Sequence, residues 1–130
     1  MTRSLGGISF RNTTCAAYMR GMCAQAKALP KRPLLFQGPC GESEKNGAVH
    51  CDHVNQSVAA FLIVRPALAW IGDGWESDDV TWNAAYLMQP GTPVGDCQEG
   101  PSAVFTREWS NGVARLDCNV WSAELPFPSL

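Results

Sequence analysis

The pattern of apolar and polar positions predicts two helices in the first half of the chain. Thr13 or Thr14 can cap a helix that runs to about Leu29. Its apolar residues recur at helical spacing: Ala16, Met19, Cys23 and Ala26. A second helix, Ser57–Val64, is apolar almost all round, so we expect it to be buried. Asn55 or Ser57 would provide its N-terminal cap.

Two short apolar runs, Leu34–Gln37 and Ala67–Ile71, predict strands on either side of the second helix. Continuous apolar runs of this length are typical of strands that are buried on both faces of a parallel sheet. The order strand, helix, strand gives a βαβ unit with a right-handed crossover. We therefore predict that the two runs pair in parallel, with the second helix packed on them.

Residues 103–120 predict an antiparallel β-hairpin with its turn at Asn111-Gly112. This turn pairs Glu108 with Arg115, which is a favourable pair of opposite charges. One face of the hairpin is then apolar, with the following residues: Phe105, Trp109, Ala114, Leu116, Cys118 and Val120.

Arg107 is the exception on this apolar face. A buried and unpaired guanidinium would cost several kcal/mol of stability. We therefore expect Arg107 to meet a carboxylate, and the candidates are Asp73 and Glu76.

Length and composition describe one globular domain spanning residues 1–130. The apolar fraction is 45% and the charged fraction 17%, values typical of a folded chain. The net charge of -2, without a basic stripe, disfavours nucleic acid as a partner. The most apolar stretch, 58–72, is interrupted by Arg65-Pro66 and is too short to cross a bilayer, so we expect no membrane insertion.

Six cysteines and two sequons, which begin at Asn12 and Asn55, favour a secreted protein or one from the secretory pathway. No apolar segment of signal-peptide length follows Met1, which is expected if the chain is cut from a longer precursor. Cys15 and Cys23 lie two helical turns apart and cannot bridge each other. The predicted disulfides are Cys40–Cys51 and Cys97–Cys118. The spacing of Cys40, His50, Cys51 and His53 matches no standard zinc site, so no metal or other cofactor is expected.

Candidate chemistry lies in the loops that follow the two predicted strands, because ligands bind at the carboxyl ends of parallel strands. Carboxylates beside an exposed indole are typical of a sugar site, where acids transfer protons and the indole stacks on the ring. The candidate catalytic acids are Glu42, Asp73 and Glu76. The candidate substrate-binding residues are Gln37, Trp75, Trp82 and Arg107.

Three segments, 67–75, 91–95 and 104–116, resemble the C-terminal end of a family of uncharacterised glycoside hydrolases with a (β/α)8 barrel. The resemblance implies an α/β fold: a partial (β/α)8 barrel in which residues 13–76 contribute the last two β/α units, followed by the C-terminal antiparallel hairpin. A complete barrel needs about 250 residues, so the chain would be a fragment. The strands that carry the acid and the nucleophile in that family have no counterpart here.

The sequence thus favours a carbohydrate-active, glycoside-hydrolase-like domain that is incomplete and inactive alone. The alternative is a small secreted, non-catalytic module that binds a sugar or a protein through Trp75 and Trp82. An acid pair at the separation used for glycoside cleavage would favour the enzyme, and a Trp platform without one would favour the module. The expected partners are a carbohydrate and either the rest of a parent barrel or a second copy of the chain.

Overall fold

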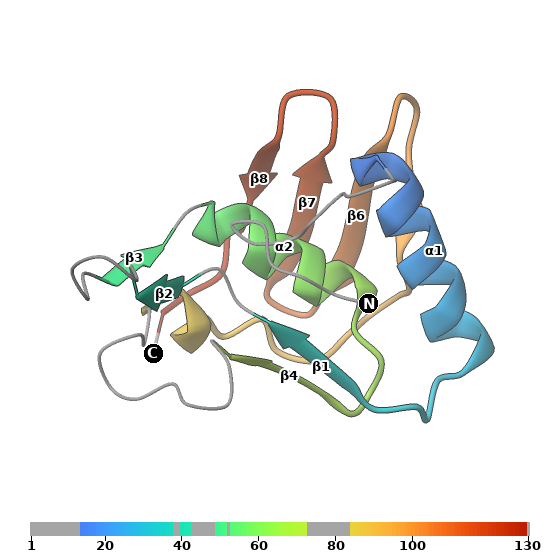
Figure 1. Ribbon diagram of the computed structural model, residues 1–130. Coiled ribbons are helices and arrows are strands. Elements are labelled where there is room, and N and C mark those ends of the chain that lie inside the picture. Colours follow the sequence, from blue (N-terminus) through green and yellow to red (C-terminus); the bar gives the residue numbers. More distant parts are fainter. Residues whose placement is uncertain (1–13, 38–39, 43–48, 52, 73–83, 130) are drawn as a thin grey trace.

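The computed structural model describes residues 14–37, 40–42, 49–51, 53–72 and 84–129, and the side chains of 37, 40–42 and 49–51 are outside this description. The elements are α1 (Cys15–Ala28), β1 (Leu34–Gln37), β2 (Cys40–Glu42), β3 (Val49–Cys51), α2 (Val54–Val64), β4 (Ala69–Gly72), a 3-10 turn η2 (Ala84–Leu87), β5 (Gln98–Glu99), β6 (Val104–Trp109), β7 (Gly112–Asp117) and β8 (Ser122–Glu124). Figure 1 shows α2 in front of the sheet that contains β6, β7 and β8, with α1 to one side and the β1–β4 pair below.

Helix α1 confirms the expected cap and extent. The Thr14 hydroxyl accepts a hydrogen bond from the Ala17 N–H at 3.1 Å, and Leu29 follows the last helical residue. Only Met19 and Cys23 of this helix are buried. The helix therefore lies at the surface and contacts the rest of the molecule along one narrow stripe.

Helix α2 forms the centre of the molecule. Every residue from Ser57 to Val64 is buried, as its apolar composition predicts. The helix contacts α1, η2 and strands β6, β7 and β8. Its start differs from the expectation, because it begins after His53, which adopts a left-handed backbone with φ 55° and makes no side-chain cap. The expected caps, Asn55 and Ser57, lie inside the helix.

The parallel pair is confirmed. β1 and β4 run parallel with Leu34 opposite Ala69, and the Phe36 ring packs edge-on against Phe61 of α2 at 5.6 Å. The pair is nevertheless buried on one face only, since Leu35 is 62% exposed and its partner Trp70 is 55% exposed. The expectation of strands covered on both faces was wrong.

The C-terminal hairpin is confirmed as part of a four-stranded antiparallel sheet, in the order β5–β6–β7–β8. Its register differs by two residues from the expected one: Glu108 faces Val113, and Arg115 faces Thr106. Arg115 instead lies 3.5 Å from Glu124 of β8. A shift of two residues leaves each side chain on its face, so Phe105, Trp109, Ala114 and Leu116 are buried as predicted, whereas Val120 is exposed.

The preceding loop explains the register. Backbone N–H groups of Ser110 and Asn111 donate to the carbonyls of Thr92 and Pro90, so both residues belong to the turn. Gly112 is then the first residue of β7, and a Cβ there would lie 3.1 Å from the Phe127 ring. These contacts are long-range, and local turn preferences do not contain them.

The partial (β/α)8 barrel was wrong. Across the described residues there are two α-helices, a small parallel pair and a four-stranded antiparallel sheet, and no repeated β/α units. In the sequence, the antiparallel strands β2 and β3 lie between β1 and α2, and α2 packs against the strands β6, β7 and β8 of the four-stranded sheet. Short apolar runs around a buried helix fit either architecture, because the pattern does not specify how many strands join the pair.

Two disulfides confirm the expectation of disulfide bonding but not the predicted partners. Cys118 is bonded to Cys15 and Cys97 to Cys23, so the Cys97–Cys118 pairing was wrong. The register of β2 and β3 places Cys40 opposite Cys51. Their side chains lie outside the described residues, so this third pairing stays a prediction.

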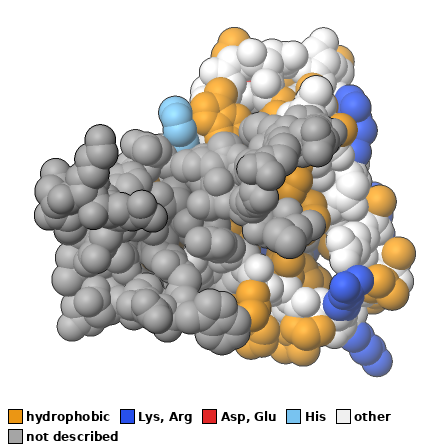
Figure 2. Space-filling model, viewed as in Figure 1, with side chains coloured by type: hydrophobic (Ala, Val, Ile, Leu, Met, Phe, Trp, Pro, Cys, Tyr) orange, Lys and Arg blue, Asp and Glu red, His pale blue; other side chains and the backbone are white. Residues whose placement is uncertain are grey.

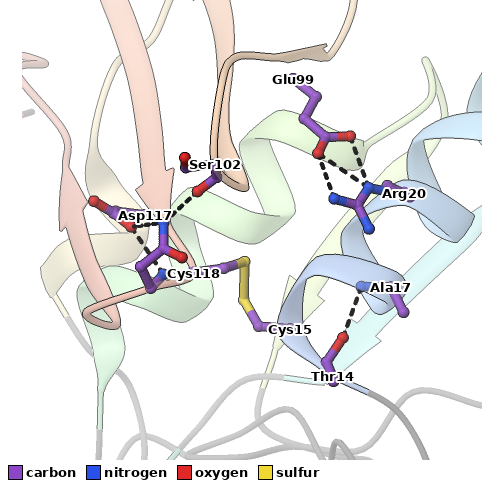
Figure 3. The surroundings of a disulfide bond; sticks show 9 residues. Thr14, Cys15, Ala17, Arg20, Glu99, Ser102, Asp117 and Cys118 are labelled. Carbon is purple, nitrogen blue, oxygen red and sulfur yellow. Dashed lines mark hydrogen bonds and ion pairs between the residues drawn. A yellow bond between two sulfur atoms is a disulfide. The ribbon is translucent and has the colours of Figure 1, made fainter.

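Figure 3 shows how the first disulfide is surrounded: Arg20 of α1 meets Glu99 of β5 beside the bond between Cys15 and Cys118. Arg20 donates from Nε and Nη2 to both Glu99 oxygens at 2.6–3.0 Å. These hydrogen bonds hold the pKa of Glu99 below its usual value. Asp117 accepts from the Asn119 N–H at 2.8 Å, which lowers the pKa of Asp117 and orders the turn after Cys118.

Disulfides persist in oxidising compartments, so the two bonds favour an extracellular or secretory-pathway location. Neither described helix is long and apolar enough to span a bilayer.

Candidate functional site

An open hollow of about 240 Å³ lies between α2, β4 and the segment around η2. We call it the aromatic hollow. It is lined by the following residues: Val58, Phe61, Leu62, Arg65, Ala69, Trp70, Ile71, Ala85, Tyr86, Met88 and Pro90. Three aromatic side chains and one guanidinium thus meet at a concave surface, whereas the other large described cavity lies on the α1 side of Arg65.

Trp70 is the residue that makes this hollow chemically distinctive. It lies in β4 between Ala69, which is buried, and Ile71, which is half-buried, and all three residues line the hollow. Trp70 is 55% exposed, so its aromatic side chain is available as an apolar surface for a ligand. Figure 2 shows patches of hydrophobic side chains on the described surface, with Lys and Arg side chains on the side that carries α1.

Arg65 brings the positive charge of the hollow. Its guanidinium carbon lies 5.0 Å from the centre of the Phe61 ring and 5.9 Å from that of Trp109. Nη2 donates to the Ala69 carbonyl at 3.3 Å, which links the end of α2 to the start of β4. Burial among these rings lowers the pKa of Arg65. The side chain is therefore held by aromatic faces and by one hydrogen bond.

Arg107 is a neighbour of Arg65. Its side chain lies on the inner face of β6, as the alternation of apolar and polar residues along this strand predicts. Its Nη1 donates to the Arg65 carbonyl at 2.7 Å and to the Leu62 carbonyl at 3.4 Å, and its Nε donates to the Gly95 carbonyl at 2.9 Å. Burial lowers the pKa of Arg107, Asp96 partly opposes this effect, and the charge of Arg65 adds to it. In the described part of the chain, backbone carbonyls hold this cation and no carboxylate lies within 4.0 Å of it.

Most of the predicted site residues lie where the structure does not test them. Asp73, Trp75, Glu76 and Trp82 fall outside the described residues, so the pairing of Arg107 with Asp73 or Glu76 stays a prediction.

The backbone places the remaining candidates. Gln37 ends β1 opposite Gly72, and Glu42 ends β2 opposite Val49. Among the described residues, no cluster of three His, Cys, Asp or Glu could hold a metal ion.

Sequence reasoning missed Trp70, Tyr86 and Arg65 as surface-forming residues. Trp70 falls in an unbroken apolar run, and such a run gives no sign of which alternate positions are exposed. Arg65 was noted only as part of the Arg65-Pro66 interruption of the apolar stretch 58–72. One signal was available: a cation directly after a buried helix can hydrogen-bond its last carbonyls or pack on nearby rings.

Comparison with protein-family models finds no match, and comparison with curated proteins finds none either. The function is therefore inferred from the chemistry of the site.

Proposed function

We propose that the chain is a small secreted binding module that holds a carbohydrate in the aromatic hollow without cleaving it. The observation that carries this proposal is Trp70, an exposed tryptophan that lines a concave surface. Large exposed apolar side chains on a hollowed surface are characteristic of binding sites. The two disulfides suit a small module outside the reducing cytosol.

The composition of the hollow favours a sugar ring among possible ligands. An indole provides an apolar plane for the C–H face of a ring, and a guanidinium provides several donors for its hydroxyl oxygens. Trp70 and Arg65 supply both from adjoining elements. The volume of about 240 Å³ is below the range of about 300–1,000 Å³ for drug-sized ligands, so a single ring fits best. The sequence resemblance to glycoside hydrolases also points to carbohydrate.

Binding rather than hydrolysis is the activity that the described lining can perform. Glycoside cleavage needs two positioned carboxyl groups. Of the described residues that line the hollow, none carries a carboxyl group. The candidate acids Glu42, Asp73 and Glu76 are not part of this described lining, and a turnover assay tests them separately.

The test measures polysaccharide binding by affinity gel electrophoresis across a panel, followed by calorimetry with oligosaccharides of any polymer that retains the chain. Loss of stacking on Trp70 should cost about 0.5–1.5 kcal/mol, so Trp70→Ala should weaken binding by up to about tenfold. The matched control is Val120→Ala, which truncates an exposed apolar residue outside the hollow and should leave binding unchanged. If no polysaccharide retains the chain, or if Trp70→Ala binds like the wild type, the proposal is wrong.

A further inference from the structure

A second cavity of about 130 Å³ lies on the other side of Arg65, between α1, the segment after α2 and β6. We call it the cationic pocket. The described residues that line it are Cys23, Ala26, Lys27, Pro30, Ile63, Arg65, Pro66, Ala67, Asp96, Cys97 and Arg107. The Cys23–Cys97 disulfide forms part of its wall and joins its α1 side to its sheet side. The pocket thus exists where three separate stretches of chain converge.

Positive charge predominates in this pocket. Lys27, Arg65 and Arg107 line it, against a single described carboxylate, Asp96. Asp96 forms no ion pair with any of these three cations at a distance of 4.0 Å or less. It is nevertheless close enough that its charge partly opposes the lowering of the Arg107 pKa by burial. Three cations and one anion leave an excess of two positive charges around a small space.

Two other described arginines differ from Arg65 and Arg107, because each forms ion pairs with carboxylates. Arg20 is matched by both oxygens of Glu99, and Arg115 lies near Asp117 and Glu124. Arg65 and Arg107 have no such partner among the described residues; burial lowers the pKa of both, and the charge of Arg65 lowers that of Arg107 further. Arg107 caps the end of α2 and Arg65 bonds the Ala69 carbonyl, but neither contact supplies a carboxylate to balance the charge of the three cations.

Hydrogen-bond donors also remain available in the pocket. Arg107 uses Nε and Nη1 on backbone carbonyls, and its Nη2 has no hydrogen-bond partner among the described residues. Toward the described residues, Arg65 donates only from Nη2, to the Ala69 carbonyl. Because carbonyls and rings hold both guanidinium groups in place, little side-chain entropy remains to be lost when they bind a ligand.

We propose that the cationic pocket binds a small oxyanion, that is, a carboxylate, sulfate or phosphate group. Guanidinium groups match the geometry of such oxygens, and a neighbouring ammonium adds charge without a demand on direction. The walls contributed by Pro30, Ile63, Pro66 and Ala67 are apolar, which strengthens electrostatic attraction inside the pocket. This site stands independently of carbohydrate binding in the aromatic hollow.

The experiment titrates the oxidised full chain with sodium sulfate, phosphate or acetate at constant ionic strength against chloride. Two-dimensional NMR and thermal unfolding report binding. At least one oxyanion should give saturable shifts and raise Tm. Lys27→Gln should weaken its affinity several-fold, and Arg65→Gln by about tenfold or more. The matched control, Lys31→Gln, removes an exposed lysine that does not line the pocket and should bind like the wild type.

Two results would overturn the proposal: shifts that do not saturate for any anion, or affinities that are equal in wild type, Lys27→Gln and Arg65→Gln. A further arm compares acetate with methyl glucuronide, with Trp70→Ala as the variant. If Trp70→Ala weakens only the glucuronide, the bound carboxylate belongs to an acidic sugar that also enters the aromatic hollow. If it weakens neither, the pocket binds the free anion. If no polysaccharide binds, the proposed carbohydrate function is wrong, but the acetate and sulfate titrations still test the cationic pocket on their own.

Discussion

At the scale of single residues, Arg107 connects two separate parts of the backbone. Its guanidinium binds the carbonyls of Leu62 and Arg65 at the end of α2 and that of Gly95 in the loop before β5. The last carbonyls of a helix have no intrahelical donors and carry partial negative charge. A cation from β6 therefore satisfies them and fixes the helix to the sheet.

Replacing this side chain should destabilise the fold substantially. Arg107→Met keeps much of the apolar stem but leaves these carbonyls without their donor, and we expect the free energy of unfolding to fall by about 2–4 kcal/mol. Urea denaturation followed by circular dichroism measures it. Arg115→Met on the neighbouring strand removes only partly exposed ion pairs and should cost less than about 1 kcal/mol. Equal losses in the two variants would contradict the assigned role.

Strand alternation correctly predicts that Arg107 faces inward, and the structure shows why its described partners could not be predicted. These partners are main-chain carbonyls of a helix more than forty residues earlier in the chain. A carbonyl is present at every residue, so no side-chain pattern marks the ones that receive a bond. Trp70 is a second such case, since its exposure depends on which other parts of the chain pack over β4.

At the scale of elements, α1 is joined to the sheet by more than packing. Its cap and its apolar spacing predict the helix well, but they do not predict where it lies. Two disulfides, of sequence separation 103 and 74, and the Arg20–Glu99 pair hold it against β5 and the end of β7. Such distant partners cannot be found from local spacing, which instead suggested the pairing of Cys97 with Cys118.

The pair of Arg20 with Glu99 makes the attachment of α1 sensitive to acid. Arg20 lowers the pKa of Glu99 in the folded chain. The contribution to stability is therefore complete above the unfolded pKa of about 4.3 and is lost as pH falls through the lower folded value. Urea midpoints measured from pH 6 down to about pH 2 should decrease more in wild type than in Glu99→Gln.

The matched variant is Glu108→Gln, which removes an exposed carboxylate that pairs with no described cation. It should retain the acid sensitivity of the wild type. If Glu99→Gln and Glu108→Gln give the same curve, the Arg20–Glu99 pair does not contribute to the pH dependence.

The β2–β3 register supports a third disulfide. Directly opposed residues of an antiparallel pair can have Cα atoms within the range that a disulfide requires, and Cys40 is opposite Cys51. We predict a bond between them. Digestion of unreduced protein with trypsin and an aspartate-specific protease, followed by mass spectrometry, should give one peptide pair containing Cys40 and Cys51. Two free thiols, or either cysteine bonded elsewhere, would disprove it.

At the scale of the whole molecule, α2 packs on the four-stranded antiparallel sheet and also contacts the parallel pair through Phe61 and Phe36, an arrangement that the apolar pattern did not reveal. The pattern predicted the buried helix and the hairpin from adjoining residues, and the parallel pair from the order strand, helix, strand. The barrel depended on how many further strands join, which a short apolar run leaves open. The aromatic hollow could not be predicted for the same reason. Its described lining comes from α2, β4 and the segment around η2, and local patterns do not determine how these elements pack together.

We expect the isolated chain to show no glycosidase turnover. Hydrolysis needs two carboxyl groups held about 5 Å apart for retention or about 6.5–9.5 Å apart for inversion. The described lining of the aromatic hollow carries no carboxyl group. A panel of aryl glycosides and polysaccharides should therefore give background rates of hydrolysis for the wild type. Turnover that disappears in Glu42→Gln, Asp73→Asn or Glu76→Gln would refute this expectation and identify the catalytic acid.

The two disulfides are nested, because the bond between Cys15 and Cys118 encloses the one between Cys23 and Cys97. The stretch between Cys23 and Cys97 is thus part of a closed covalent ring. A protease that cuts one peptide bond in that stretch opens the ring without releasing a fragment. The nicked molecule keeps its mass, apart from one added water, until a reductant separates the pieces. Such a chain can lose the continuity of its backbone and still remain one molecule.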